Sequence, residues 1–84
     1  MSAEVGFRRV DVSYRVLEAW GVPMSLIPIL EWLRSIESDL PKDARCAAVR
    51  WNENFNRVEL TMCSVEWERM DPIPEFNVTV RAMP

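Results

Sequence analysis

The residues able to carry chemistry are few in this chain. It has 84 residues, with no histidine, two cysteines and two glycines. Without histidine, neither a Ser-His-Asp triad nor a Cys-His pair can form, and two glycines are too few for a phosphate-cradling loop. Glu66 and Glu68 alternate on one predicted strand, but a catalytic carboxylate pair needs a cleft that separates its pKa values. We therefore expect no catalytic site and no enzyme.

The two cysteines, Cys46 and Cys63, fall on the two strands of a predicted hairpin. The register given below sets them opposite each other, close enough for a disulfide if oxidised. The expected state is two reduced thiols on a sheet face, and a redox switch is the alternative. Two thiols without histidine supply too few ligands for a structural zinc site. We expect neither a metal nor another cofactor.

Trp67 and its neighbours form the candidate binding site. Residues 52–76 contain six acidic side chains and two arginines, a local charge of −4. An apolar patch with an aromatic anchor beside charged residues commonly marks an interaction site. The predicted partner-binding residues are Cys63, Val65, Glu66, Trp67, Glu68 and Asp71.

Two alternatives for this surface stay open. A β-bulge near Ser64 would turn Val65 and Trp67 into the core. The acidic side chains would then be an ordinary solvated face that keeps a small protein soluble.

The segment from Ser25 to Leu40 is the element on which the rest is expected to pack. Its apolar residues recur at spacings of three and four, as on one face of a helix. We expect the Ser25 hydroxyl to cap the helix, Pro28 to lie in the first turn and Pro41 to end the helix. Ile27 points toward the polar side. The apolar stripe consists of Leu26, Ile29, Leu30, Trp32, Leu33, Ile36 and Leu40.

Alternating apolar residues predict strands on both sides of this helix. The first strand is expected from Arg9 to Trp20, although residues 16–20 would also fit a short helical turn closed by Gly21. Ala44 to Trp51 and Arg57 to Glu68 flank an Asn-rich turn, which is typical of a hairpin. The sequence thus places strands before and after the helix.

The hairpin register follows from matching side chains across the strands. On the face toward the helix, the favoured register pairs Trp51 with Val58, Val49 with Leu60 and Ala47 with Met62. On the other face it pairs Arg50 with Glu59, an ion pair, and Cys46 with Cys63. A shift by one residue would lose these matches.

A last strand is expected from Glu75 to Met83, which completes the order β-α-β-β-β. The prediction is a single α+β domain over residues 1–84, in which one helix packs on a mainly antiparallel four-stranded sheet in two layers. The place of the first strand in the sheet stays open. The expected sheet core consists of Val10, Val12, Tyr14, Val49, Trp51, Val58, Leu60, Phe76, Val78 and Val80.

One helix covers only one face of such a sheet, so the other face must meet solvent or a partner. The residues expected there include polar Arg9, Asp11, Arg50, Glu59 and Arg81, and apolar Leu17, Cys46, Ala48, Cys63, Val65 and Trp67. Function is therefore expected on this uncovered face.

Charge and hydropathy narrow the class of partner. The net charge is −3, which argues against a general nucleic-acid or anionic-membrane binder because those present basic surfaces. The chain has no apolar run of secretory or membrane-spanning length, so we expect a cytoplasmic protein.

The leading functional prediction is a non-catalytic protein-binding module, such as an inhibitor, antitoxin-like protein or adaptor, that acts through the exposed sheet face and its acidic rim. One alternative is a homodimer that binds a small molecule in a pocket built from Trp20, Trp51 or Trp67. Another is a nucleic-acid-binding protein that uses Arg8, Arg9 and Arg15. The identity of the protein partner stays open.

Overall fold

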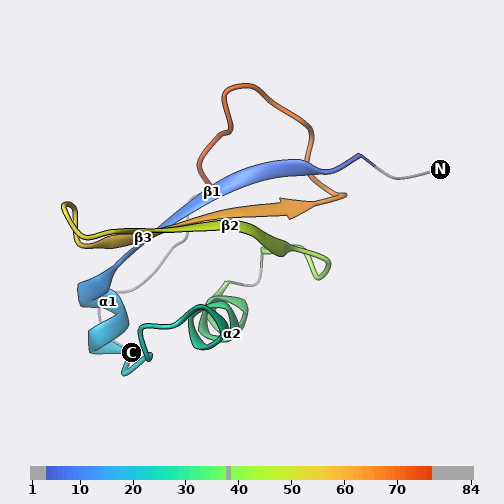
Figure 1. Cartoon of the computed structure of the whole chain (residues 1–84). Coiled ribbons are helices and arrows are strands. Elements are labelled where there is room, and N and C mark those ends of the chain that lie inside the picture. The colour runs from blue at the N-terminus through green and yellow to red at the C-terminus, as the bar shows by residue number, and fades with distance from the viewer. Residues whose placement is uncertain (1–3, 38, 77–84) are drawn as a thin grey trace.

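The computed structural model describes residues 4–37 and 39–76. It is a small α+β fold, with a three-stranded antiparallel sheet and two helices on one of its faces (Figure 1). The strands lie in the order β1-β3-β2, so β3 is the central strand. The elements are β1 (Gly6–Ser13), α1 (Tyr14–Ala19), α2 (Leu26–Ile36), β2 (Arg45–Asn52) and β3 (Arg57–Ser64).

The predicted α+β class is confirmed, whereas the four strands and the β-α-β-β-β order are not. The described residues contain three strands, and two helices connect β1 to β2. Of the expected last strand, only Glu75 and Phe76 lie within the described residues. Glu75 forms an isolated parallel bridge with Arg9 of β1 rather than extending the hairpin beyond β3. Val78, Val80, Arg81 and Met83 lie outside the described residues.

Of the two alternatives for the end of the first strand, the helical turn is the one observed, because the chain leaves β1 after Ser13 and forms α1. The Ser13 hydroxyl accepts a hydrogen bond from Arg15 N (3.2 Å), so it satisfies an amide that a helix start leaves unpaired. Gly21 ends this turn at a φ of +69°, a value that glycine adopts without steric cost. Leu17 is therefore buried in the core and does not lie on the uncovered face.

Helix α2 is shorter than the predicted span from Ser25 to Leu40. Ser25 occupies the N-cap position, but its side chain makes no capping hydrogen bond. The helix ends at Ile36, because Glu37 adopts an extended conformation and its Oε1 instead accepts a bond from Asp39 N (3.2 Å). Ile27 is exposed, as the apolar pattern predicts.

The hairpin register is confirmed from Ala48 to Asn52. Val49 pairs with Leu60, Arg50 with Glu59, and Trp51 with Val58. The turn is held by Asn52, whose Oδ1 accepts from Phe55 N (3.3 Å), and by Asn56, which has a positive φ of 50°.

A register shift between Cys46 and Ala48 overturns the rest of the predicted hairpin. The irregularity leaves Ala47 without its predicted partner, because Cys46 now faces Met62. Cys63 instead pairs with Arg45, so the expected Cys46–Cys63 pair is wrong. Both cysteines are free.

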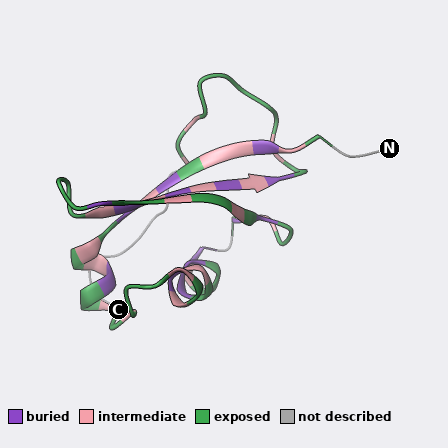
Figure 2. Ribbon diagram, viewed as in Figure 1, coloured by how far each residue is buried: buried purple, intermediate pink, exposed green. Residues whose placement is uncertain are grey.

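Eleven buried apolar residues form the core, and Figure 2 shows that buried positions occur in all three strands and in both helices. Trp51 was expected among them, but it is 40% exposed at the end of β2. The core consists of Val10, Val12, Leu17, Ile29, Trp32, Leu33, Leu40, Ala44, Val58, Leu60 and Met62.

Candidate protein interaction surface

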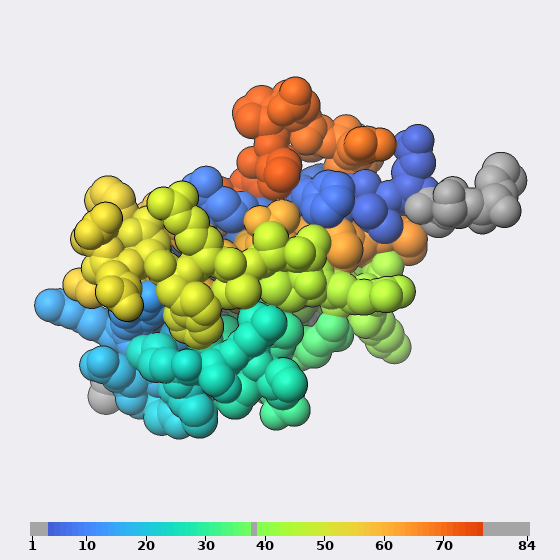
Figure 3. All heavy atoms as spheres, viewed as in Figure 1, coloured from blue at the N-terminus to red at the C-terminus, as the bar shows by residue number. Residues whose placement is uncertain are grey.

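Residues 65–76, here called the edge segment, follow β3 and return along the outer edge of β1. Arg9 N donates to Pro74 O (3.1 Å), and Phe76 N donates to Arg9 O (2.9 Å). In Figures 1 and 3 the segment, in orange, arches beyond β1 and away from the helices. The outer edge of β1 is therefore covered by a piece of the same chain.

The edge segment approaches β1 closely at Gly6. A Cβ atom on Gly6 would lie 2.4 Å from Trp67 O and 2.5 Å from Glu68 O. Real Cβ atoms do not come so near to backbone oxygens, so only glycine fits at this position. One of the two glycines of the chain thus fixes where the segment crosses the strand.

Trp67 anchors the edge segment to the body of the domain. Its ring is half-buried against the core, with its centroid 5.8 Å from that of Phe76 and 5.6 Å from the Arg8 guanidinium. Arg8 also donates to Glu68 O (3.0 Å). The bulge near Ser64, which was one of the alternatives, is not formed, since Ser64 ends β3 in regular register opposite Gly6. Trp67 therefore neither stands free on the surface nor enters the core completely.

Asp43 holds the beginning of the edge segment. Its two carboxylate oxygens accept hydrogen bonds from Ser64 Oγ (2.6 Å) and Val65 N (2.9 Å). These bonds favour the charged form, so the Ser64 hydroxyl and the Val65 amide hold the pKa of Asp43 below its usual value. Together with the bridge at Glu75, they fix both ends of the segment.

Between these fixed ends the segment presents apolar and acidic side chains to solvent. Val65, Met70 and Ile73 are 52%, 51% and 48% exposed. The acidic side chains of the segment are Glu66, Glu68, Asp71 and Glu75, against one base, Arg69. The exposed apolar side chains therefore lie in a negatively charged surround.

The structure brings together five of the six predicted partner-binding residues, since Val65, Glu66, Trp67, Glu68 and Asp71 all belong to the edge segment. Cys63 lies apart on β3, between Phe7 and Arg45. Met70 and Ile73, which are exposed on the same segment, were not among the predicted residues. The available signal was two large apolar side chains beside prolines in an acidic stretch.

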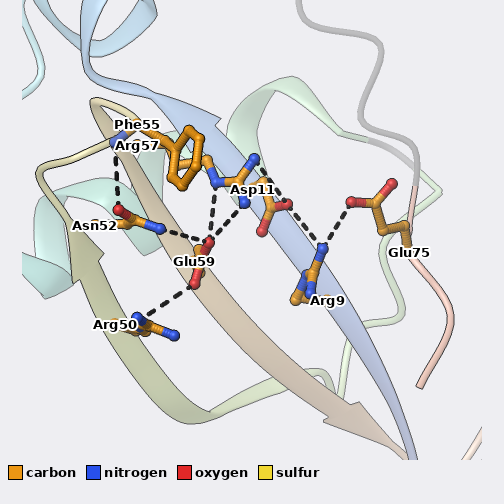
Figure 4. A network of polar contacts seen from close by, with 8 residues as sticks. All are labelled: Arg9, Asp11, Arg50, Asn52, Phe55, Arg57, Glu59 and Glu75. Carbon is orange, nitrogen blue, oxygen red and sulfur yellow. Dashed lines mark hydrogen bonds and ion pairs between the residues drawn. The ribbon is translucent and has the colours of Figure 1, made fainter. Parts of the chain in front are cut away.

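The sheet face away from the helices carries a polar network (Figure 4) that includes four of the polar residues predicted there, Arg9, Asp11, Arg50 and Glu59. Glu59 lies at its centre: its Oε2 accepts from Asn52 Nδ2 (3.2 Å) and Arg57 Nε (2.9 Å), and Arg50 lies 3.9 Å from Oε1. Hydrogen bonds from Asn52 and Arg57 lower the pKa of Glu59. The charged side chains of this part of the face are therefore paired with one another.

Asp11 occupies the β1 side of the same network. Its Oδ2 lies 3.3 Å from Arg9 and 4.0 Å from Arg57, whereas its Oδ1 is buried without a hydrogen-bond partner. Burial raises the pKa of Asp11 despite the neighbouring Arg9. Asp11 and Glu59 are adjacent across β1 and β3, yet the pKa of Asp11 is raised and the pKa of Glu59 is lowered.

The arginines considered for nucleic-acid binding are largely engaged within the chain. Arg8 bonds to the carbonyls of Phe7 and Glu68, and Arg9 forms ion pairs with Asp11 and Glu75 (3.1 Å). Arg15 is exposed on α1. These contacts leave no basic stripe of three free guanidinium groups.

The three tryptophans of the predicted small-molecule pocket lie at different places in one chain. Trp20 packs on Trp32 with ring centroids 6.0 Å apart, Trp51 packs on Tyr14 at 6.4 Å, and Trp67 packs on Phe76. A pocket shared by all three is therefore not formed within one chain.

No protein-family model, curated protein or solved structure matches this chain. Among the described residues, no cluster of three or more acidic or thiol side chains is arranged to hold a metal ion. Neither helix in this part of the chain is long and apolar enough to cross a membrane. The functional argument therefore depends on the geometry of the surfaces described above.

Proposed function

We propose that this protein is a non-catalytic protein-binding module that uses the edge segment as its contact surface. The observation that carries the proposal is that the edge segment is fixed at both ends and still exposes apolar side chains. Val65, Met70 and Ile73 stay exposed on a segment held by Asp43, Gly6, Trp67 and the bridge to β1. Such a pre-ordered segment loses little conformational entropy on binding.

The charge of the edge segment favours a basic partner. Its four acidic side chains and one arginine give a net charge of −3. Complementary charge raises the rate of association more than it raises affinity. We therefore expect a partner surface with basic residues around an apolar recess for Met70 and Ile73, as in inhibitors and adaptors that block or bridge another protein.

The test is affinity capture from the native host with matched variants. The double variant Met70→Ser and Ile73→Ser is expected to reduce partner capture at least about tenfold, because buried apolar anchors dominate interface energies. Ile27→Ser is the control, since Ile27 is also an exposed aliphatic residue but lies at the start of α2. Capture that Ile27→Ser reduces as strongly, or that the double variant leaves unchanged, would contradict the proposal.

The acidic side chains are tested separately by kinetics. The triple variant Glu66→Gln, Glu68→Gln and Asp71→Asn should slow association with the captured partner about three- to tenfold and change dissociation little. High salt should reproduce this effect in the wild type. A loss expressed mainly in the dissociation rate would assign these carboxylates to direct contacts instead.

Light scattering decides whether the partner is a second copy. A dimeric mass that the Met70→Ser and Ile73→Ser variant converts to a monomer would identify the surface as a self-association interface. A monomeric wild type that captures a different protein supports the module proposed above.

A further inference from the structure

A cavity of about 330 Å³ opens at the opposite side of the domain from the edge segment. It lies where α1, the connector before α2 and the β2–β3 hairpin meet, and Figure 3 shows the hairpin turn, in yellow, against this connector, in teal. The cavity is lined by Tyr14, Glu18, Met24, Trp51 and Glu53. Its lining therefore combines two aromatic rings, a thioether and two carboxyl groups, without a basic residue.

The fold holds the aromatic wall of this cavity in place. Tyr14 N donates to Asn56 O (2.8 Å), which ties the start of α1 to the hairpin turn. The Tyr14 and Trp51 rings lie 6.4 Å apart at an interplanar angle of 37°. Trp51 nevertheless stays 40% exposed, so its ring is open to a ligand.

Comparison with the other aromatic residues shows what this wall lacks. The Arg8 guanidinium lies 5.6 Å from the Trp67 ring, and that of Arg57 lies 5.2 Å from the Phe55 ring. Among the described residues, no cation of the chain lies over Tyr14 or Trp51. An aromatic face attracts cations through its quadrupole, so the rings of Tyr14 and Trp51, which line the cavity, are available to an external cation.

The carboxylates of the cavity form no ion pair with any basic side chain that the structure describes. Within residues 4–37 and 39–76, Glu18 and Glu53 form no ion pair, whereas Asp11, Glu59 and Glu75 all do. Two unpaired acidic groups beside aromatic rings favour a positive ligand and repel an anion. Met24, which is 44% exposed, adds a polarizable and adaptable wall.

We infer that this cavity binds an organic ammonium group, of the trimethylammonium type, against the rings of Tyr14 and Trp51 with Glu18 and Glu53 at its rim. A methylated ammonium suits such a wall because its methyl groups pack on the rings while its charge remains. The site lies on a different surface from the edge segment and is independent of the protein-binding function proposed above.

The test is an NMR titration of the full chain with choline and with its uncharged carbon isostere, 3,3-dimethyl-1-butanol, at constant ionic strength. Choline should shift the Trp51 indole N–H signal saturably at millimolar concentrations, up to about 50 mM, and the isostere should bind at least about tenfold more weakly. The indole signals of Trp20, Trp32 and Trp67 are internal controls and should not move.

Charge-neutral variants separate the cavity from general acidity. Glu18→Gln with Glu53→Gln should weaken choline binding at least about fivefold, because both retain size and lose charge. Glu66→Gln with Glu68→Gln makes the same change in net charge on the edge segment and should leave binding unchanged. Trp51→Leu should abolish binding while the circular dichroism spectrum stays that of the wild type.

The same titration with a methylated peptide identifies the source of the ammonium group, and three outcomes would overturn the inference. A peptide with one trimethyl-lysine that binds more tightly than choline, and more tightly than its unmethylated form, assigns the group to a protein side chain. Equal binding of choline and the peptide assigns it to a free small molecule. Equal binding of choline and its isostere, shifts of all four indole signals together, or no shift at all would overturn the cation site.

Discussion

The two edges of the sheet end in different ways. At β1, backbone hydrogen bonds at Arg9 join the edge segment to the strand, and Trp67 and Gly6 fit the two together. At β2, no segment within the described residues pairs with the outer side of the strand, and Trp51 stands partly exposed beside an open cavity. One edge is therefore covered by the chain itself, while the other is left with ligand-sized space.

This difference separates two uses of tryptophan on one small domain. The Trp67 ring packs on Arg8 and Phe76. These contacts fix the edge segment, whose other apolar side chains are exposed. Trp51 has Tyr14 as its aromatic neighbour within the described part of the chain, and it lines the cavity. The first is a positioning residue for the proposed protein-binding surface, and the second is itself part of the proposed ligand site.

The largest expected effect on stability comes from a substitution at Gly6, where the edge segment crosses β1. Gly6→Ala should lower the free energy of unfolding by about 2–3 kcal/mol, because its methyl group would overlap the backbone of Trp67 and Glu68. Gly21→Ala adds the same methyl group where no atom lies within 4 Å and should cost only about 1 kcal/mol, through its positive φ. Urea denaturation measures both, and equal costs would mean that the edge segment is not pressed against β1.

The next effect compares the two tryptophans. Trp67→Ala should destabilise the domain by about 2 kcal/mol, since a half-buried ring loses its contacts with Phe76, Arg8 and the core. Trp51→Ala should cost less than about 1 kcal/mol, because part of its ring already faces water. If the order of the two measured costs is reversed, the assignment of structural and ligand-facing roles is wrong.

A pH series tests how the edge segment is fastened. The pKa of Asp43 is lower in the folded state, so the unfolded chain binds more protons. Its stabilising contribution is present above the unfolded pKa, about 4, and is lost as the pH falls through the folded pKa. Asp43→Asn should therefore flatten the acidic part of the stability curve, measured as urea midpoints at successive pH values.

Asp11→Asn is the contrasting variant. Burial raises the pKa of Asp11, so the folded state binds more protons and Asp11 opposes folding as the pH rises past its unfolded pKa. Removing this group should make the rise of stability with pH steeper. A curve that both variants change in the same direction would contradict the assigned shifts.

The smallest effect concerns the exposed ion pairs at the two edges. Arg50→Ala on the β2 side and Glu75→Ala on the β1 side should each change stability by less than about 0.5 kcal/mol, because solvent screens exposed pairs. Denaturation midpoints check this. A large cost for Glu75→Ala alone would show that charge, rather than backbone pairing and Trp67, holds the covered edge.

The sequence predicts structure most accurately where strand alternation and a turn signal occur together, as in the β2–β3 hairpin. The alternation in Val49 and Trp51, with Arg50 opposite Glu59 and an Asn-rich turn, was enough to fix the hairpin register near the turn. Leu17 was misplaced because the strand alternation of β1 continues for several residues past Ser13, although Ser13 is itself a good N-cap residue. The cap signal was present, and the period-two pattern masked it.

Contacts between residues that are far apart in the sequence have no comparable signal in the sequence pattern. Two adjacent alanines give no indication that a bulge begins at Ala47, so the opposition of Cys46 and Cys63 could not be tested from pattern alone. The sequence of residues 65–76 does not indicate that this segment returns to β1. A glycine is needed where the segment crosses the strand, but that glycine, Gly6, is far away in the chain. The cavity at Trp51 likewise joins residues from three separate segments, namely α1, the connector before α2 and the β2–β3 hairpin.

The bulge at Ala47 has a consequence for the behaviour of the protein at high concentration. An open, flat edge strand is a template on which a second chain can add and aggregate. The irregular register between Cys46 and Ala48 twists β2 away from that flat form, and the charged side chains of Arg45 and Arg50 flank it. The edge that the chain leaves uncovered is thereby blunted against fibre-like growth while the cavity at its far end stays accessible.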